Sequence, residues 1–206
     1  MISSKIYRLF ELCSCLWYLY IEKKQDLFLP DPENKSVPYQ ELIKKDDVVI
    51  EIGVRFGGLT TRLAKMGSLV YSFEPNFLNY QILKAHLRKQ KISNVIPIRK
   101  KIGDGRKHTK TIDSFHIPNA TVMVLDCETY ESALLANSPE TLKSVHTIVV
   151  ETHFLNDRED TMLDVWKILS ERGFVLNRII IKNYVPIPQQ DWASICLFKK
   201  ASISNP

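Results

Sequence analysis

The sequence predicts one α/β domain whose core is a doubly wound, mostly parallel sheet that ends in an antiparallel strand pair. Residues 47–75 read as strand, glycine turn, helix and strand, which is half of a nucleotide-binding βαβ unit. Further apolar runs alternate with helical patterns, as expected for parallel strands joined by crossover helices. The last two apolar runs, 175–182 and 194–199, are separated by a segment with two prolines. Such a segment cannot form a crossover helix, so these two strands should be antiparallel.

Composition is that of an ordinary globular protein. The chain has 206 residues, of which 45% are hydrophobic and 25% charged. This length and hydrophobic fraction are enough for one substantial core. The four cysteines, at 13, 15, 127 and 196, lack the paired spacing of a zinc site. No secretory signal is evident, so reduced thiols and a cytoplasmic location are expected.

The N-terminal 38 residues are expected to form a unit of their own, followed by the α/β domain at 39–206. Apolar residues from Ile2 to Ile21 recur at helical spacing and indicate an amphipathic helix, which a proline-containing connector follows. The uninterrupted apolar run, 12–21, is too short for a bilayer, which requires about 20 residues. Packing in the core or in a homodimer is the simpler role for this helix, and docking on a membrane surface is the alternative.

The first half of the domain can be followed element by element. The β-branched run 48–52 is too short for a helix and predicts a buried strand. A helix at 59–66 and a second strand at 68–73 follow, and Asn76 is a good N-cap for the next helix. Residues 95–102 alternate between apolar and polar, which places this third strand near a sheet edge.

The second half begins with a brief helix at 111–115. Four elements follow: a buried strand at 121–125, a helix at 131–143 that is kinked or split near Pro139, a buried strand at 147–150 and a helix at 158–172. The last helix should turn five apolar residues inward, namely Met162, Leu163, Val165, Trp166 and Leu169.

Four of the predicted strands end in an acidic residue. They are Glu51, Glu74, Asp126 and Glu151. Ligands of doubly wound sheets bind at the carboxyl ends of the strands. If the strands are parallel, these four acids therefore meet at one candidate site.

The glycine turn indicates which ligand it binds. Dinucleotide sites use G-x-G-x-x-G, in which the second glycine admits a pyrophosphate. Here the pattern is E-x-G-x-x-x-G-G, running from Glu51 through Gly53 to Gly57 and Gly58, with Arg55 at the second glycine position. Bulk at Arg55 and the charge of Glu51 both disfavour a pyrophosphate. An acid at this point suits the cationic amino group of S-adenosylmethionine (SAM), so SAM is favoured over NAD.

A second group of acids follows the fourth strand. Asp126 and Glu128 are candidate general bases for a substrate hydroxyl, and Glu151 and His153 follow the fifth strand. Clustered carboxylates could also bind Mg²⁺, which prefers oxygen ligands. Cys127 is flanked by acids, which disfavour a thiolate, so a cysteine nucleophile is not expected.

Net charge is +5, a mild bias. The basic run 99–110 would suit nucleic acid or a membrane surface, but it contains no interleaved aromatic residue. Nucleic acid is therefore not the expected partner, and a small molecule is.

Three motifs resemble the FkbM-type SAM-dependent methyltransferases over residues 47–199. They are E-I-G-V-R-F-G-G at 51–58, F-E-P-N at 73–76 with Tyr80 and Leu83 after it, and L-D-C-E-T-Y-E at 125–131. T-I-D-S-F at 111–115 and V-V-E-T-H at 149–153 are similar to further elements of that family.

The resemblance implies a class I methyltransferase fold and methyl transfer to a hydroxyl of a sugar or natural product. It implies that Glu51, Gly53 and Gly57 line the methionine end of SAM, and that Glu74 binds its ribose. Arg55, Pro75 and Asn76 belong to the same motifs, and Asp104 would lie near the adenine. Asp126, Glu128 and Glu151 would face the methyl donor and the acceptor, a small molecule or glycan.

Three positions depart from the family pattern. Glu51 replaces the usual Asp, Arg55 stands where Asn is common, and Thr129 replaces a glycine. The change at Thr129 leaves a second hypothesis beside the enzyme, a SAM-binding or scaffold protein with little catalysis. An NAD-linked oxidoreductase is disfavoured by the glycine spacing.

Overall fold

The computed structural model describes residues 37–67, 69–106, 108–127, 130–154, 161–181 and 192–201, and of these it leaves the side chains of 153, 154, 161, 181, 192 and 193 undescribed. The expected N-terminal helix, Glu128 and Thr129 lie outside the described residues.

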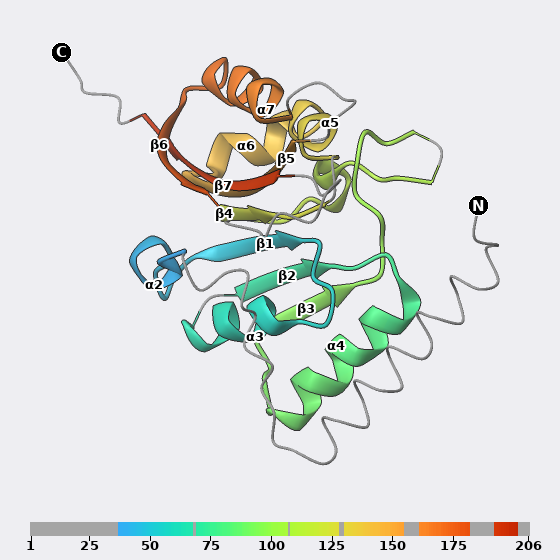
Figure 1. Ribbon diagram of the computed structural model, residues 1–206. Helices are drawn as coiled ribbons and strands as arrows, with labels where there is room; N and C mark the ends of the chain where they lie inside the picture. Colours follow the sequence, from blue (N-terminus) through green and yellow to red (C-terminus); the bar gives the residue numbers. More distant parts are fainter. Residues whose placement is uncertain are drawn as a thin grey trace.

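A seven-stranded sheet forms the centre of the domain (Figure 1). Its order is β3-β2-β1-β4-β5-β7-β6. The strands are β1 Val48–Ile52, β2 Leu69–Phe73, β3 Val95–Ile98, β4 Ala120–Leu125, β5 Thr147–Phe154, β6 Phe174–Ile181 and β7 Trp192–Lys200. Strands β1 to β5 pair in parallel, whereas β7 runs antiparallel between β5 and β6. The predicted doubly wound sheet and its antiparallel terminal pair are thereby confirmed.

Helices cover both faces of the sheet (Figure 1). The helices are α2 Tyr39–Leu42, α3 Gly58–Lys65, α4 Phe77–Lys89, α5 Glu131–Ala136, α6 Pro139–Ser144, α7 Thr161–Ser170 and the 3-10 helix η1 Ile112–Phe115. Because side chains alternate along a strand, Val49 packs with α2, α3 and α4, while Ile50 and Ile52 pack with α5, α6 and α7. The two resulting cores hold the carboxyl ends of the parallel strands in fixed positions.

Several element boundaries differ from the sequence prediction. Strand β3 lies at the sheet edge, as expected, but ends at Ile98 rather than at 102. The helix expected at 131–143 is split near Pro139, one of its two predicted forms, into α5 and α6. Within the described residues, no helix is long and apolar enough to cross a membrane.

Helix α7 corrects an expectation about the core. Val165 and Leu169 are fully buried, but Leu163 is 58% exposed and Trp166 46% exposed. At 100° per residue, the five apolar positions span more of the helix than one buried face can cover. Leu163 and Trp166 therefore face outward.

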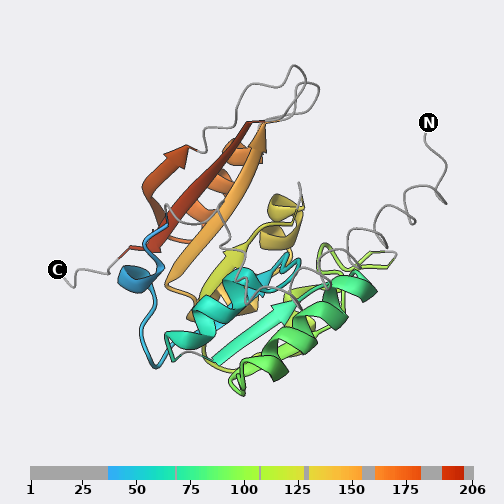
Figure 2. The ribbon, with the colours of Figure 1, turned by 60° about the horizontal axis from the view of Figure 1, so that its bottom comes forward.

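Strand β5 also runs further than predicted. Figure 2 shows β5 and β7 continuing together past the end of β4. Pairing of β5 with β4 stops at Val150, but pairing with β7 continues to Phe154. Glu151 therefore lies inside the strand rather than after it, because β7 supplies the backbone partners that β4 no longer can.

Candidate functional site

Backbone register brings the strand-end residues into one row. Phe73, Ile52, Leu125 and Val150 are partners across β2, β1, β4 and β5. One residue further along each strand stand Glu74, Gly53, Asp126 and Glu151. The ladder continues into this row, since Gly53 N–H donates to the Phe73 carbonyl (3.2 Å) and Asp126 N–H donates to the Ile52 carbonyl (2.9 Å). Three of the four expected acids thus share one edge of the sheet.

The glycine turn after β1 is compact because two of its residues have no side chain. Gly53 has φ +89°, and a Cβ placed on it would lie 1.5 Å from the Asp126 carbonyl oxygen. Gly57, the N-cap of α3, has φ +86°, and its Cβ would lie 2.5 Å from Cδ1 of Leu83. Backbone therefore excludes any side chain at Gly53, and the left-handed φ favours glycine at Gly57.

Arg55 adopts a glycine-like backbone in the same turn. Its φ is +51°, in the left-handed region that Asn tolerates better than most side chains. This conformation explains why Asn is a favourable residue at this position. It also directs the Arg55 N–H at Glu74.

Glu74 is held by backbone donors from both sides. Arg55 N–H donates to Oε2 (2.9 Å), Asn76 N–H donates to Oε1 (2.8 Å), and the Asn79 amide lies 3.5 Å from Oε1. The residue is only 4% exposed. Burial raises the pKa of Glu74 above its usual 4.5, although the backbone N–H bonds of Asn76 and Arg55 oppose the rise. A carboxylate has about four acceptor positions, so Glu74 retains capacity for a hydroxyl donor.

Asn76 fixes the entry to α4, as the sequence predicts. Its side-chain oxygen accepts from Leu78 N–H (2.8 Å) and Asn79 N–H (3.2 Å), which is the geometry of an N-cap. Because Asn76 also donates to Glu74, the cap of α4 and the orientation of the carboxylate are coupled.

Glu51 was expected to end its strand, but it lies within β1, two residues before Gly53, and is 2% exposed. Its Oε2 accepts from the Thr60 hydroxyl of α3 (2.7 Å) and the Ser72 hydroxyl of β2 (2.9 Å). These bonds link β1, β2 and the first turns of α3. Thr60 and Ser72 were not predicted as partners of Glu51, although Ser72 is its register partner.

Asp104 lies in the loop after β3 and closes that loop. Its Oδ1 accepts from Arg106 N–H (2.9 Å) and from the Thr109 hydroxyl (3.0 Å). The Arg106 N–H bond lowers the pKa of Asp104 below its usual 3.8. Because Asp104 lies on the loop beyond β3, it is not part of the row of strand-end residues.

The segment after β4 is anchored through Glu131. Asp126 is half-buried, and Cys127 N–H donates to Oε1 of the fully buried Glu131 (3.0 Å). Burial raises the pKa of the Cys127 thiol well above its usual 9.0, and the Glu131 carboxylate raises it further. The thiol stays protonated at neutral pH, in agreement with the expectation that it is no nucleophile.

Of the other expected catalytic side chains, the structure describes only that of Glu151. Glu151 is 6% exposed and lies on the same face of β5 as Val149. Glu128 and the His153 side chain lie outside the described residues, although the His153 backbone belongs to β5. Among the residues that the structure describes, no group of three His, Cys, Asp or Glu could hold a metal ion.

Asp113 has a structural role that was not predicted from the sequence. From η1 it accepts the N–H groups of Glu140 (3.0 Å) and Thr141 (2.8 Å) and the Thr141 hydroxyl (2.6 Å). It thus caps the N-terminus of α6 from another part of the chain, a role that local sequence does not reveal.

Comparisons with known proteins identify the fold. No family model and no curated protein matches the sequence. Solved structures that are similar include precorrin-6y C5,15-methyltransferase from Geobacter metallireducens (TM-score 0.55, 11% identity, 79% of this chain and 84% of that one). The N-terminal domain of EvdMO1 with SAH bound is also similar (TM-score 0.59, 15% identity, 83% and 81%). M. jannaschii TYW2 in complex with AdoMet is a third (TM-score 0.51, 18% identity, 85% and 79%). The chain has the class I, Rossmann-like methyltransferase fold.

Proposed function

We propose that the chain is a SAM-dependent methyltransferase, with its site in the domain at 39–206. One observation carries the proposal. The Gly53–Gly57 turn is bonded to Glu74 through Arg55 N–H and packed against the Asp126 carbonyl. The glycine turn, the acid proposed to bind the ribose (Glu74) and the acid proposed to face the acceptor (Asp126) therefore lie together at one edge of the sheet.

The cofactor half of the site would lie over β1 and β2. Structures with this fold contain SAH in EvdMO1 and AdoMet in TYW2. The N-terminus of α3 after Gly57 offers unpaired backbone N–H groups. Glu51 and Gly53 would lie towards the methionine end of SAM and Glu74 on its ribose, while Pro75, Asn76 and Asp104 would lie towards the adenine.

Glu74 suits a ribose better than a phosphate. Two backbone N–H bonds and the Asn79 amide occupy three of its roughly four acceptor positions, and the position that is left can accept a ribose hydroxyl. A dinucleotide pyrophosphate would instead have to pass Arg55, whose side chain occupies the second glycine position. The residues of this edge thus fit SAM.

The acceptor half would begin at Asp126, beside Glu151. We propose O-methylation of a sugar or natural-product hydroxyl, in keeping with the FkbM-like motifs and with an EvdMO1 structure obtained in the presence of SAH and D-fucose. SAM would supply a methyl group on a sulfonium, whose sulfur keeps the electron pair of the broken C–S bond. Asp126 would orient the acceptor hydroxyl and take its proton, while Glu128, Glu151 and His153 are further candidates for that role.

Calorimetry with SAH and with NAD tests the cofactor. We expect SAH to bind, NAD not to bind, and Glu74→Ala to weaken SAH at least about tenfold through loss of charge-assisted hydrogen bonds. Glu171→Ala, which removes an exposed acid after α7, is the matched control. Binding of NAD without SAH would contradict the proposal.

Transfer of labelled methyl from SAM to a panel of sugars and natural products tests the chemistry. We expect Asp126→Ala to lower the rate about 100-fold or more with little change in SAH affinity. An unchanged rate would remove Asp126 from the catalytic centre. SAH binding without transfer to any acceptor would favour the scaffold hypothesis instead.

A further inference from the structure

The net charge of the chain is concentrated in one surface segment. The chain has 28 Lys/Arg and 23 Asp/Glu residues, and the run 99–110 contains six of the basic residues and one of the acidic ones. The rest of the chain therefore has 22 basic and 22 acidic residues, which balance. The run therefore carries a formal charge of +5, equal to that of the whole chain. Its described cations are all exposed, and we call them the basic rim: Arg99, Lys100, Lys101, Arg106 and Lys110.

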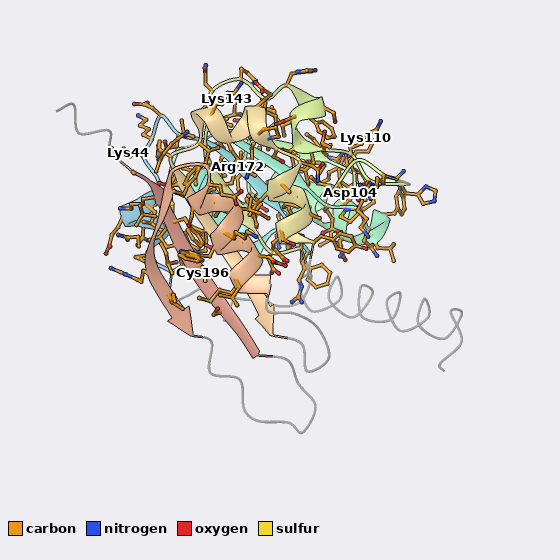
Figure 3. The ribbon with its side chains drawn as sticks, turned by 90° about the horizontal axis from the view of Figure 1, so that it is seen from above. Lys44, Asp104, Lys110, Lys143, Arg172 and Cys196 are labelled. Atoms are coloured by element: carbon orange, nitrogen blue, oxygen red, sulfur yellow. The ribbon has the colours of Figure 1, made fainter. Side chains whose placement is uncertain are left out.

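The basic rim lies at the carboxyl end of the sheet. It follows β3 directly, and in Figure 3 Asp104 and Lys110 stand on the opposite side of the molecule from Lys44, which precedes β1. Asp104 is the one acid of the run, and its salt bridge with Arg106 (3.7 Å) offsets a single cation. The rim therefore borders the site built on Glu74 and Asp126.

The fold brings aromatic rings to this rim that the run itself lacks. The Arg99 guanidinium lies 5.4 Å from the ring centroid of Phe77, the first residue of α4, and the Lys101 ammonium lies 4.1 Å from that of Tyr130. Phe77 is 54% exposed and Tyr130 42% exposed. Phe77 follows the Glu74 motif and Tyr130 the Asp126 segment, so the rings flank both halves of the site. In the folded protein the basic run therefore has the neighbouring aromatic rings that its own sequence lacks.

We propose that the basic rim, with Phe77 and Tyr130, binds a single strand of nucleic acid. Exposed cations that neutralise successive phosphates, together with rings on which bases stack, are the two components of single-strand recognition. The identity of the strand as RNA rests on the proposed function, because a ribose 2′-hydroxyl is a sugar hydroxyl that the Asp126 half of the site would accept.

Fluorescence polarisation with labelled 12-nucleotide polyuridine tests the binding, with SAH titrated separately. The triple variant Lys100→Gln, Lys101→Gln, Lys110→Gln should weaken polyuridine binding about tenfold or more. It should also reduce the slope of log affinity against log salt concentration by about 2, because fewer counterions are released. SAH affinity should not change. The matched control is Lys45→Gln, Lys65→Gln, Lys89→Gln, which removes three exposed charges at the amino end of the strands. An equal loss in the control would overturn the proposal.

The aromatic part has its own test. Tyr130→Leu should weaken polyuridine about tenfold, whereas Tyr130→Phe, which keeps the ring, should bind like the wild type. Equal affinity of the Leu variant would remove the stacking role. Sedimentation with phosphatidylserine vesicles separates the competing partner: binding to vesicles without binding to polyuridine would make the rim a membrane surface. If SAH binds and polyuridine does not, this proposal fails and the proposed function stands.

Discussion

The Asp126 carbonyl oxygen lies so close to Gly53 that a Cβ on Gly53 would be 1.5 Å from it. This contact joins the end of β1 to the end of β4. It therefore fixes the distance between the turn proposed for the cofactor and the acid proposed for the acceptor.

Gly53→Ala should therefore destabilise the domain and abolish SAH binding. The left-handed φ and the clash with backbone together should cost about 3 kcal/mol or more. Urea unfolding and calorimetry measure the two effects. Gly173→Ala is the matched control, because Gly173 has φ +78° but nothing within 4 Å of its Cβ position. It should cost only about 1–2 kcal/mol and leave SAH affinity intact. Equal costs for the two variants would show that the Asp126 contact is unimportant.

Affinity for SAH should fall when the pH is lowered through a midpoint above 4.5. Burial raises the pKa of Glu74 above that value, and protonation removes acceptor capacity for a ribose hydroxyl. Calorimetry across pH 4 to 8 gives the midpoint. Glu74→Gln should bind weakly and without this pH dependence, and a retained midpoint in that variant would assign the titration to another group.

Stability provides an independent measure of the same pKa. A raised pKa means that the folded state binds the proton more tightly than the unfolded state does. The contribution of Glu74 to stability is therefore complete below pH 4.5 and is lost as the pH rises through the raised pKa. The unfolding free energy of the wild type relative to Glu74→Gln should decrease over that window.

The parallel sheet and two of its strand-end acids were readable from sequence because each acid directly follows a mostly apolar run. Glu74 and Asp126 come directly after β2 and β4, whose residues are mostly buried. The end of β5 was predicted at 150 rather than at Phe154, because the length of β5 depends on pairing with β7, in which Ile195 is the partner of Glu151. Local pattern contains no information on such pairing.

Side-chain partners within the site were less predictable than the strands. A buried acid requires donors, but sequence does not say which ones, and Thr60 and Ser72 become partners of Glu51 only once β1, β2 and α3 pack. The aromatic neighbours of Arg99 and Lys101 likewise come from α4 and from the start of α5. Contacts between elements therefore account for most of what the sequence left open.

Ser72→Ala and Thr60→Val should each destabilise the domain by about 1.5–3 kcal/mol, because each removes a hydrogen bond to the buried Glu51 carboxylate. Chemical denaturation measures the loss. Thr109→Val provides the comparison, since it removes a similar bond to the more exposed Asp104 and should cost less than about 1 kcal/mol. Similar losses at the three positions would contradict a special role for Glu51.

Asp113→Ala should lower stability by about 1–2 kcal/mol without affecting SAH affinity. The variant removes the cap of α6, which consists of two backbone N–H bonds and one hydroxyl bond. Asp113→Asn keeps one acceptor oxygen and should lose less. A large loss of SAH affinity in a folded Asp113→Ala protein would show that η1 contributes to the site.

Cys127 should resist alkylation at neutral pH although it lies beside the proposed acceptor site. Burial, and the Glu131 carboxylate after it, raise the pKa of the thiol well above 9.0, and the thiolate is the form that reacts. Peptide mapping by mass spectrometry after iodoacetamide treatment should show modification of Cys127 only above pH 9 or in urea. Glu131→Gln removes the contribution of that carboxylate to the raised pKa and should speed the reaction, provided that urea unfolding shows the variant folded. Rapid modification of the wild type at pH 7 would mean that the segment after β4 opens, and that Asp126 is not held against Gly53.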